Sequence, residues 1–380
     1  MLFDATAVPA DRRGVGRYVD SVIPAFAGTE ASIRVLCRPE DVEHYRQLSG
    51  QPAVAAPRLT GRRPTRLVWE QLGLPGLARA HRPDVLHSPH YTHPMLLSLT
   101  RRLPLAVTLH DATFFTDPGL HTRAKGPFFR TAARLALRGA DACLVPSQAT
   151  ADELVAHAGA RPEQLQVAHL GVDTSVFRPP TEQAKAAVRA SLGLESDLPY
   201  FAFLGTIEPR KNVPALIRGW AAAFAHRADP PALVLAGGAG WDTEVDAAIA
   251  ELPATLRLIR PGYLPLDQLA GLLGGAEVVV YPSLGEGFGL PVLEGMACGA
   301  AVLTTRNLAL AEVGGDAVAY TGTEPAAIGR ALVELIDDPE RRERLGKLGL
   351  ARAELFSWQS CAQAHVKAYH SAIERHGARR

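Results

Sequence analysis

The chain has 380 residues, of which 47% are hydrophobic and 21% are charged, and its formal net charge is +1. This chain is longer than a domain with a single hydrophobic core usually is, so we expect two domains. A nearly neutral charge excludes a typical nucleic-acid-binding protein, and the absence of any apolar run of about 18 residues gives no transmembrane helix.

The cysteines and the distribution of charge indicate where in the cell the protein is expected. The four cysteines are scattered, without a CxxC pair or metal-ligand spacing, and the first residues lack the apolar core of a signal peptide. Residues 1–178 hold 21 Lys and Arg against 16 Asp and Glu. We therefore expect a cytoplasmic protein, and the basic first half leaves open peripheral contact with the inner face of the cell membrane.

Short apolar runs alternate with helix-sized stretches along the whole chain. The runs are continuous, as in strands buried on both faces of a parallel sheet. This order predicts an α/β fold with two Rossmann-like, doubly wound domains that face each other across a cleft. The predicted strands are 104–109, 142–146, 200–204, 232–236, 256–259, 277–281 and 301–304, and predicted helices include 128–138, 149–158, 214–225 and 265–273.

The domain boundary is predicted where the sequence VFRPP precedes a polar, helical stretch. The expected domains are residues 1–178 and 179–355. Residues 356–380 read as a C-terminal helix without a strand of its own, which leaves either domain as a packing partner. We predict that it crosses back to the first domain.

The sequence DRRGVGRYV places Gly14 and Gly16 between the first strand and a helix. Alone, a GxG pair often marks only a tight turn, and no third glycine completes a dinucleotide fingerprint. This disfavours a Rossmann dehydrogenase. The neighbouring Arg17 adds positive charge to the loop or is a solvated surface residue.

A second polar group follows the strand in VTLHDATFF, where His110 and Asp111 stand at its carboxyl end. Ligands of open α/β sheets bind at that end. By spacing alone, a single strand-end histidine is more often structural than functional. Weaker candidates nearby are His87, His90, Tyr91 and Ser147.

In LGTIEPRKN, Gly205 and Thr206 follow a strand and lead to the adjacent cations Arg210 and Lys211. Two cations at a strand's carboxyl end suit a diphosphate. Without this context, such a pair is usually a solvated surface.

The segment SLGEGFGLPVLEGMACG carries the strongest signal. Pro291 stands where a helix would begin, so residues 287–290 present backbone N–H groups at a helix N-terminus, a site suited to phosphate. Glu286 and Glu294 flank it. Carboxylates beside a phosphate site suit the neutral hydroxyls of a sugar or ribose, although Glu294 alone could simply compensate the helix dipole.

The two glutamates, seven residues apart, resemble the E-x7-E signature of the family-four retaining glycosyltransferases, which have the GT-B fold. The flanking sequences VVVYPS, EGMACGAAVLTT and AEVGGDA agree with that family, as do the RKN element and GVGRY. The last two are common among mannosyl- and rhamnosyltransferase-like members. One departure is Thr206, where many relatives carry arginine, and Arg210 is a candidate to replace that charge.

The resemblance implies roles for individual residues. The first glutamate contacts hydroxyls of the donor sugar and the second the ribose, while the basic pair neutralises the diphosphate and the strand-end histidine binds the sugar. The first domain then lies on the acceptor side and the second on the donor side. The implied catalytic residues are His110, Glu286, Lys211 and Arg210; the implied donor-binding residues are Gly14, Gly16, Gly205, Thr206, Arg210, Lys211, Tyr263, Gly287, Phe288, Gly289, Leu290 and Glu294; the acceptor candidates are Asp111, His87, Tyr91 and Arg17.

The expected reaction is retaining transfer of a hexosyl or deoxyhexosyl group from a GDP-mannose or dTDP/UDP-sugar type donor to a glycan, a lipid-linked or a small-molecule acceptor, as in polysaccharide biosynthesis. No D-x-D triplet is present to clamp a metal–diphosphate complex, so we expect no metal and no cofactor. We expect no nucleic-acid partner. The alternatives are an epimerase or hydrolase of nucleotide sugars with the same fold, or a non-catalytic sugar-nucleotide-binding subunit.

Overall fold

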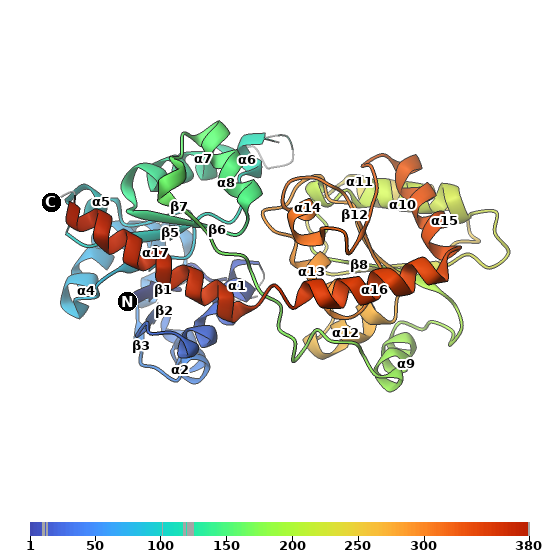
Figure 1. Ribbon diagram of the computed structural model, residues 1–380, viewed down its shortest axis with the longest axis horizontal. Helices are drawn as coiled ribbons and strands as arrows, with labels where there is room; N and C mark the ends of the chain where they lie inside the picture. The colour runs from blue at the N-terminus through green and yellow to red at the C-terminus, as the bar shows by residue number, and fades with distance from the viewer. Residues whose placement is uncertain (10–11, 13, 101, 117–118, 120–124, 379–380) are drawn as a thin grey trace. The chain divides into compact units, whose positions relative to one another are not determined.

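The computed structural model describes the chain except residues 10–11, 13, 101, 117–118, 120–124 and 379–380 (Figure 1). The chain forms two compact units: the first comprises Met1–Gly171 and Ser357–Arg380, and the second comprises Val172–Phe356. The first unit thus gives way to the second a few residues before position 178, and the C-terminal segment lies in the first unit.

In the described part of the first unit, seven strands form one parallel sheet in the order β3-β2-β1-β4-β5-β6-β7. Short apolar segments form these strands because both faces of the sheet are covered by helices. The strand order reverses between β1 and β4, which is the switch point where open α/β sheets bind ligands. The strands are β1 Leu2–Asp4, β2 Arg34–Cys37, β3 Ala53–Ala55, β4 Leu86–Ser88, β5 Leu105–Thr108, β6 Ala142–Val145 and β7 Leu165–Val167.

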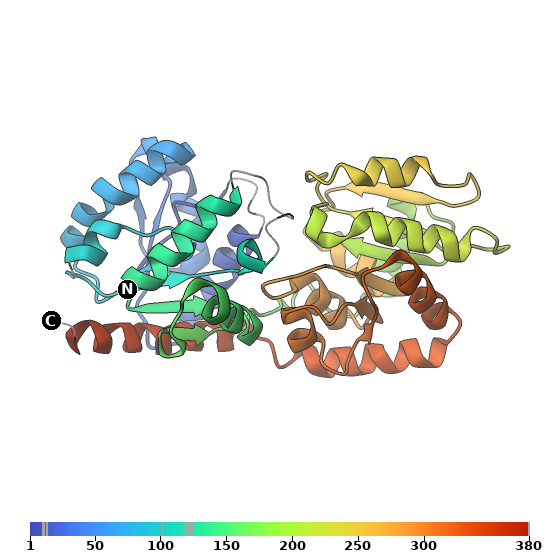
Figure 2. The ribbon, with the colours of Figure 1, turned by 90° about the horizontal axis from the view of Figure 1, so that it is seen from above.

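Helices pack on both faces of this sheet. Helix α17 lies beside α1 on one face, and α7 lies on the opposite face (Figure 2). Hydrogen bonds tie α17 down, from Tyr369 Oη to His87 Nδ1 at 2.8 Å and from Tyr18 Oη to His365 Nε2 at 2.5 Å. The helices are α1 Val15–Ala25, α2 Val42–Ser49, α3 Arg63–Leu72, α4 Leu74–His81, α5 Met95–Thr100, α6 Thr113–Thr116, α7 Lys125–Gly139, α8 Gln148–Ala158 and α17 Trp358–Ala378.

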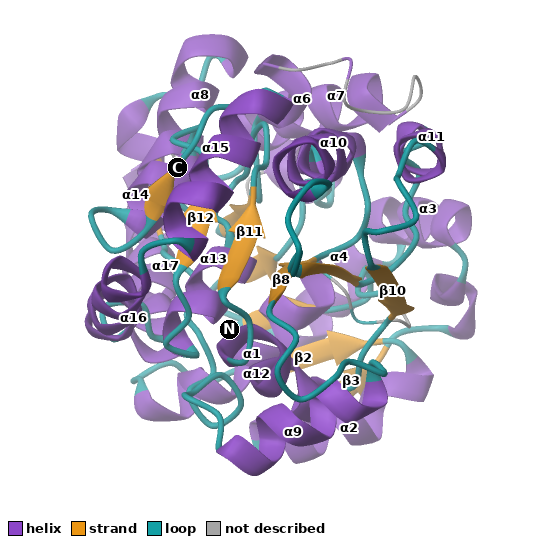
Figure 3. Ribbon diagram, turned by 90° about the vertical axis from the view of Figure 1, so that its right-hand side faces the viewer, coloured by secondary structure: helices purple, strands orange, loops and turns teal. Residues whose placement is uncertain are grey.

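In the second unit, the parallel sheet has the order β10-β9-β8-β11-β12-β13. Its middle strands are buried and almost entirely apolar, and β8, β11 and β12 can be followed in Figure 3. The strand order reverses between β8 and β11. The strands are β8 Tyr200–Leu204, β9 Ala232–Ala236, β10 Leu258–Gly262, β11 Val278–Tyr281, β12 Val302–Thr304 and β13 Ala319–Tyr320.

The helices of the second unit pack in pairs over its sheet, with α10 against α15, α9 against α12 and α13 against α16. The structure confirms the predicted pair of doubly wound α/β domains. Within the described residues, no helix has both the length and the apolar character needed to cross a bilayer. The helices are α9 Glu182–Ser191, α10 Val213–Phe224, α11 Glu244–Ala250, α12 Leu266–Gly274, α13 Leu290–Ala297, α14 Ala309–Gly314, α15 Pro325–Ile336 and α16 Pro339–Ala353.

The loops after β8 and β9 pack so closely that one position must be glycine. Gly237 has φ +131°, and a Cβ atom there would lie 2.1 Å from the carbonyl oxygen of Gly205. We expect Gly237→Ala to destabilise the second unit by on the order of 2 kcal/mol, through both the clash and the backbone strain. Urea unfolding followed by tryptophan fluorescence measures this.

Gly76 in α4 offers a matched control for that substitution. An added Cβ there meets nothing within 4 Å. Gly76→Ala should therefore leave stability unchanged or raise it by up to about 1 kcal/mol, since alanine is the better helix former. Equal unfolding midpoints for Gly237→Ala and the unchanged protein would contradict the expectation.

Candidate functional site

The candidate site of the second unit lies at the carboxyl ends of β8 and β11. These parallel strands are neighbours, so the loops that follow them meet at one edge of the sheet. The backbone N–H of Leu284 donates to the carbonyl oxygen of Arg210 at 2.7 Å, and Ser283 Oγ lies 2.8 Å from the same oxygen. The two predicted motifs, 75 residues apart in sequence at Lys211 and Glu286, are thereby joined.

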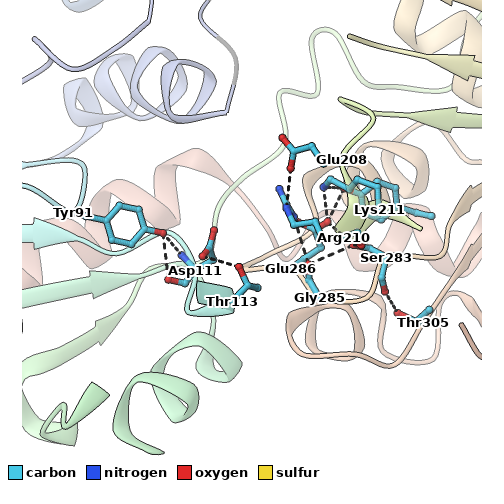
Figure 4. Close-up of polar contacts among 11 residues, drawn as sticks. Tyr91, Asp111, Thr113, Glu208, Arg210, Lys211, Ser283, Gly285, Glu286 and Thr305 are labelled. Carbon is cyan, nitrogen blue, oxygen red and sulfur yellow. Dashed lines mark hydrogen bonds and ion pairs between the residues drawn. The ribbon is translucent and has the colours of Figure 1, made fainter. Parts of the chain in front are cut away.

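The carboxylate of Glu286 is the centre of this site (Figure 4). It is buried and forms ion pairs with both Arg210 and Lys211. Its Oε1 also accepts hydrogen bonds from Tyr281 Oη at 3.0 Å and Ser283 Oγ at 2.7 Å. The structure thus brings together Arg210, Lys211 and Glu286, which the sequence placed in one site.

These contacts fix the charge of the carboxylate. Burial by itself would raise the pKa of Glu286, but the charges of Arg210 and Lys211 outweigh it and lower that pKa to about 2. Glu286 is therefore ionised at neutral pH and can accept, but not donate, hydrogen bonds from hydroxyl groups.

Lys211 is the buried cation of the site. Its Nζ donates to Tyr281 Oη and lies 4.7 Å from the centre of the Tyr281 ring. Burial and the nearby charge of Arg210 lower the pKa of Lys211 to about 8, despite the opposing charge of Glu286. A bound anion would stabilise the protonated form further.

Arg210 has a second carboxylate partner, because its Nε donates to Glu208 Oε2 at 3.0 Å. Asn212 follows the two cations and has a φ of +58°. Its Nδ2 donates to the Thr323 carbonyl at 2.8 Å, and the chain turns here into α10. The RKN element is thus both a cationic pair and the start of a helix.

Helix α13 begins beside Glu286, at Leu290, with a proline in its first turn as predicted. Gly289 precedes it with φ +108°, and a Cβ atom there would lie 2.7 Å from Leu310 Cδ2. Glu294 is fully buried in this helix, and Phe288 is buried against Phe356. A helix N-terminus next to two cations can hold an anion.

Other predicted donor-binding residues surround these loops. Gly205 and Thr206 are half-buried directly after β8, and Gly287 is buried after Glu286. Tyr263, which follows β10, is 65% exposed. The exposed ring has room to stack on a planar group such as a base.

In the first unit, His110 follows β5 and is half-buried. Its Nε2 lies 2.7 Å from the carbonyl oxygen of Pro89, an atom that only accepts, so Nε2 carries the hydrogen and Nδ1 is an acceptor in the neutral ring. Burial lowers the pKa of His110, which keeps the ring neutral. His110 can therefore accept a hydrogen bond from a hydroxyl group.

Two acceptor candidates next to it are bonded to each other (Figure 4). The N–H of Asp111 donates to Tyr91 Oη at 2.9 Å, and Asp111 Oδ1 accepts from Thr113 Oγ1 at 3.1 Å. The ring of His110 is oriented through Nε2 by the Pro89 carbonyl.

His87 and Ser147 have structural positions. His87 is fully buried, and its ring nitrogens bond Thr108 Oγ1 and Tyr369 Oη, both at 2.8 Å. The proposed acceptor contact of His87 therefore does not fit, because no ring atom is presented to a ligand. Ser147 is also buried, and its Oγ caps helix α8 by accepting from the N–H of Thr150 at 3.0 Å.

The N-terminal glycine loop leads into α1. Gly14 stands just before the helix with φ +52°, while Gly16 is buried within it, where a Cβ atom would lie 3.3 Å from Val8 Cγ1. Arg17 is half-buried on the same helix. Asp11 and Arg13 of this motif lie outside the described residues.

A buried polar cluster, of which only His90 was a candidate from the sequence, lies at the switch point of the first sheet. In the described part of the chain, Asp4, Glu70 and His90 are the group whose ligand atoms, all within 4.8 Å of one another, could hold a metal ion. Arg66 already pairs with Glu70 at 2.6 Å, and Thr92 Oγ1 donates to the same carboxylate at 2.8 Å. Since the guanidinium supplies the positive charge, we assign no metal to this cluster.

Comparison with known proteins agrees with this architecture. The profile of Glycosyltransferase Family 4 matches residues 12–176, and that of Glycosyl transferases group 1 matches residues 184–352. A D-inositol 3-phosphate glycosyltransferase of Streptomyces bingchenggensis is 33% identical over 334 residues, covering 79% of this chain and 70% of the relative. The chain belongs to the group 1 glycosyl transferases.

Further relatives of this glycosyltransferase agree in sequence and fold. The O-antigen chain mannosyltransferase B of Escherichia coli is 29% identical over 295 residues, covering 77% of this chain and 75% of that protein. Sucrose-phosphate synthase from Thermosynechococcus elongatus superimposes with a TM-score of 0.76 at 19% identity, covering 97% and 98% of the two chains. Anabaena Alr3699/HepE, solved in complex with UDP-glucose, gives 0.75 at 19% identity, covering 97% and 99%. The fold is GT-B, as the resemblance implied.

Three contributors to the site of this glycosyltransferase were missed from sequence. Tyr281 and Ser283 both bond Glu286, and Glu208 pairs with Arg210. Tyr281 and Ser283 could have been predicted, because they are two residues apart at the end of a strand and such residues point to the same side.

Proposed function

We propose that this glycosyltransferase is a retaining, metal-independent enzyme that transfers a hexosyl or deoxyhexosyl group from a nucleotide-diphosphate sugar to an acceptor hydroxyl. The observation that carries the proposal is the buried Glu286 carboxylate, held by Arg210 and Lys211 at the switch-point edge beside the N-terminus of α13. A carboxylate suits sugar hydroxyls, and the cations and helix terminus suit a diphosphate.

In the proposed complex, the sugar hydroxyls donate to Glu286 and the ribose hydroxyls to Glu294. His110 accepts a further hydroxyl through Nδ1, which the Pro89 contact of Nε2 leaves as the acceptor. Tyr263 stacks on the base. The donor would exchange part of the ion pairing within the site for contacts of Arg210 and Lys211 with the diphosphate.

For the chemical step we propose front-face substitution. The bond between the anomeric carbon and the diphosphate oxygen breaks, and the acceptor oxygen bonds to the same face of that carbon. The departing phosphate takes the acceptor's proton, while Arg210 and Lys211 stabilise its developing charge. Glu286 is not assigned as a nucleophile, since its oxygens are engaged by four side chains.

The donor is proposed to be of the GDP-mannose or dTDP/UDP-sugar type. The Escherichia coli relative is named a mannosyltransferase, and the Anabaena structure holds UDP-glucose. The acceptor is proposed to be a hydroxyl of a glycan, a glycolipid or a small molecule.

A thermal-shift screen over nucleotide sugars, repeated in excess EDTA, tests the proposal. Ligand at 100 times its Kd stabilises the folded protein by about 2.7 kcal/mol, so a true donor should raise Tm clearly. Retained shifts and retained transfer in EDTA are expected. No shift with any nucleotide sugar, or activity that needs a divalent ion, would contradict the proposal.

Donor affinity should depend on pH through Lys211. The protonated lysine attracts the diphosphate, and with a pKa near 8 it loses its charge as pH rises above that value. We therefore expect the donor Kd to be flat below pH 7 and to rise by up to about tenfold per unit above pH 8. Lys211→Met should bind more weakly and without this dependence, as calorimetric titration from pH 6.5 to 9.5 would show.

A further inference from the structure

The outer surface of the first unit carries an unusual concentration of exposed apolar side chains. Leu72, Val68 and Leu99 are 70%, 60% and 79% exposed, in helices α3 and α5. Of the 15 large hydrophobic side chains exposed in the described part of the chain, eight fall between residues 59 and 135. Exposed apolar patches of this kind mark interaction sites. The eight are Leu59, Val68, Leu72, Met95, Leu96, Leu99, Phe128 and Leu135.

These side chains lie on helices that share one layer. Helix α5 contacts both α3 and α7, and the inner sides of the three helices, including Trp69, Leu97 and Ala133, are buried in one hydrophobic core with the sheet. Their exposed residues therefore point away from the sheet on the same side. This layer is the face opposite α17 (Figure 2). We call the exposed residues of α3, α5 and α7 the outer face.

Positive charge is interleaved with the apolar residues. Residues 58–138 contain 13 Lys and Arg against four Asp and Glu, and one of the four, Glu70, is buried in an ion pair. The guanidinium of Arg63 lies 5.4 Å from the centre of the Phe128 ring, so cation and aromatic side chain meet between α3 and α7. Arg134 and Arg138 are exposed on α7.

A hollow lies beside the outer face, between α5 and α7. It has a volume of 370 Å³, and its lining combines Leu99, Leu103, Leu135 and Arg138 with the bonded pair of Asp141 and His376. Its apolar part, next to Arg138, suits an acyl chain beside an anionic headgroup. A basic and apolar surface binds an anionic bilayer through both charge and burial.

We propose that the outer face of α3, α5 and α7 is a peripheral docking surface for an anionic lipid bilayer. The apolar residues insert at the boundary between headgroups and acyl chains, and the arginines contact lipid phosphates. This inference goes beyond the proposed reaction and does not depend on which acceptor is used. It assigns the membrane contact to defined residues.

Vesicle flotation of the full chain tests the proposal, with phosphatidylcholine vesicles that either contain or lack phosphatidylglycerol. The protein should float with the anionic vesicles and not with the neutral ones, and high salt should weaken the binding. Arg134→Gln with Arg138→Gln should lower the partition coefficient about fivefold per arginine, and Leu96→Ser with Leu99→Ser about tenfold in all.

Matched controls lie on the second unit. Leu266→Ser with Leu348→Ser removes exposed leucines there, and Arg344→Gln with Lys347→Gln removes exposed cations. Both should bind vesicles like the unchanged protein. Tm is measured on all variants to show that they fold.

Three results would overturn the docking surface. They are no flotation with anionic vesicles, equal binding to neutral vesicles, or equal losses in the control variants; a face that binds a protein partner instead would give the first. Nucleotide-sugar thermal shifts on the same samples separate the two proposals. Retained shifts without flotation would reject the docking surface alone, whereas absent shifts with flotation would reject the proposed donor.

Discussion

Replacing Lys211 with methionine is expected to lower kcat/KM for transfer by about 100- to 1000-fold, the range seen when one preorganised charge-stabilising group is removed. Lys211 is buried at the edge where β8 and β11 end, next to Glu286 and Tyr281. In the proposed reaction, its ammonium group stabilises the charge that develops on the departing diphosphate. Methionine has a similar volume and no charge.

The same substitution should leave stability nearly unchanged, which separates chemistry from folding. Burial already disfavours the charged lysine, as its lowered pKa of about 8 indicates, and Arg210 remains as a cationic partner of Glu286, so an apolar side chain of the same size costs little. Lys347→Met removes an exposed lysine of α16 and serves as the control. Steady-state kinetics with unchanged Tm is the expected result, and normal turnover in Lys211→Met would disprove this role.

The second large effect is expected for Glu286→Gln, which keeps the shape of the side chain and removes its charge. Transfer should fall by about 100-fold or more, because the amide cannot accept from sugar hydroxyls as strongly as a carboxylate. Lys211 would also lose its counter-ion and face Arg210, while Arg210 keeps Glu208 as a partner. Unlike Lys211→Met, this variant should therefore lose stability, by on the order of 3 kcal/mol.

The charge change has a further, measurable consequence at Lys211. Glu286 holds up the pKa of Lys211, so its removal should shift the pH above which donor binding weakens to below 8. Glu251→Gln, which removes the partner of Arg218 in an exposed ion pair, is the matched control and should change none of these quantities. Unchanged transfer, or an unchanged pH profile with intact donor binding, would refute the assignment.

Glu294→Ala provides a contrast within the same motif. The side chain of Glu294 lies fully buried in α13 and is proposed to bind the ribose rather than the reacting sugar. We expect it mainly to raise KM for the donor, because ribose contacts are alike in the ground and transition states. Kinetics on both glutamate variants would distinguish the two roles.

Much of the fold could be predicted from local sequence. The runs 200–204 and 232–236 form β8 and β9 with the predicted bounds, because continuous apolar stretches of this length suit strands covered on both faces. The start of α13 at Leu290 follows from Pro291, whose fixed φ suits a first helical turn. Strand β10 begins at Leu258, two residues later than predicted. The apolar run in the sequence starts before the residues that form the strand.

Side-chain roles were less readable, because they depend on partners far away in sequence. His87 lies in β4 and His110 follows β5. Tyr369 of α17 bonds a ring nitrogen of His87, whereas His110 is bonded through Nε2 to the Pro89 carbonyl, so one is structural and one presents an acceptor nitrogen. Spacing alone cannot separate these cases. The network of Asp4, Arg66 and Glu70 was missed for the same reason.

The sequence by itself determined the two-domain α/β organisation, the cationic pair, the two glutamates and the family. These follow from local periodicity, proline and glycine placement, and contiguous motifs. Only the tertiary structure decided that Arg210 and Lys211 form ion pairs with the Glu286 carboxylate. The reason is that β8 and β11 are neighbours in the sheet although they are not consecutive along the chain. The tertiary structure also decided the charge state of that site and gathered the outer face, since burial and the packing of separate helices set both.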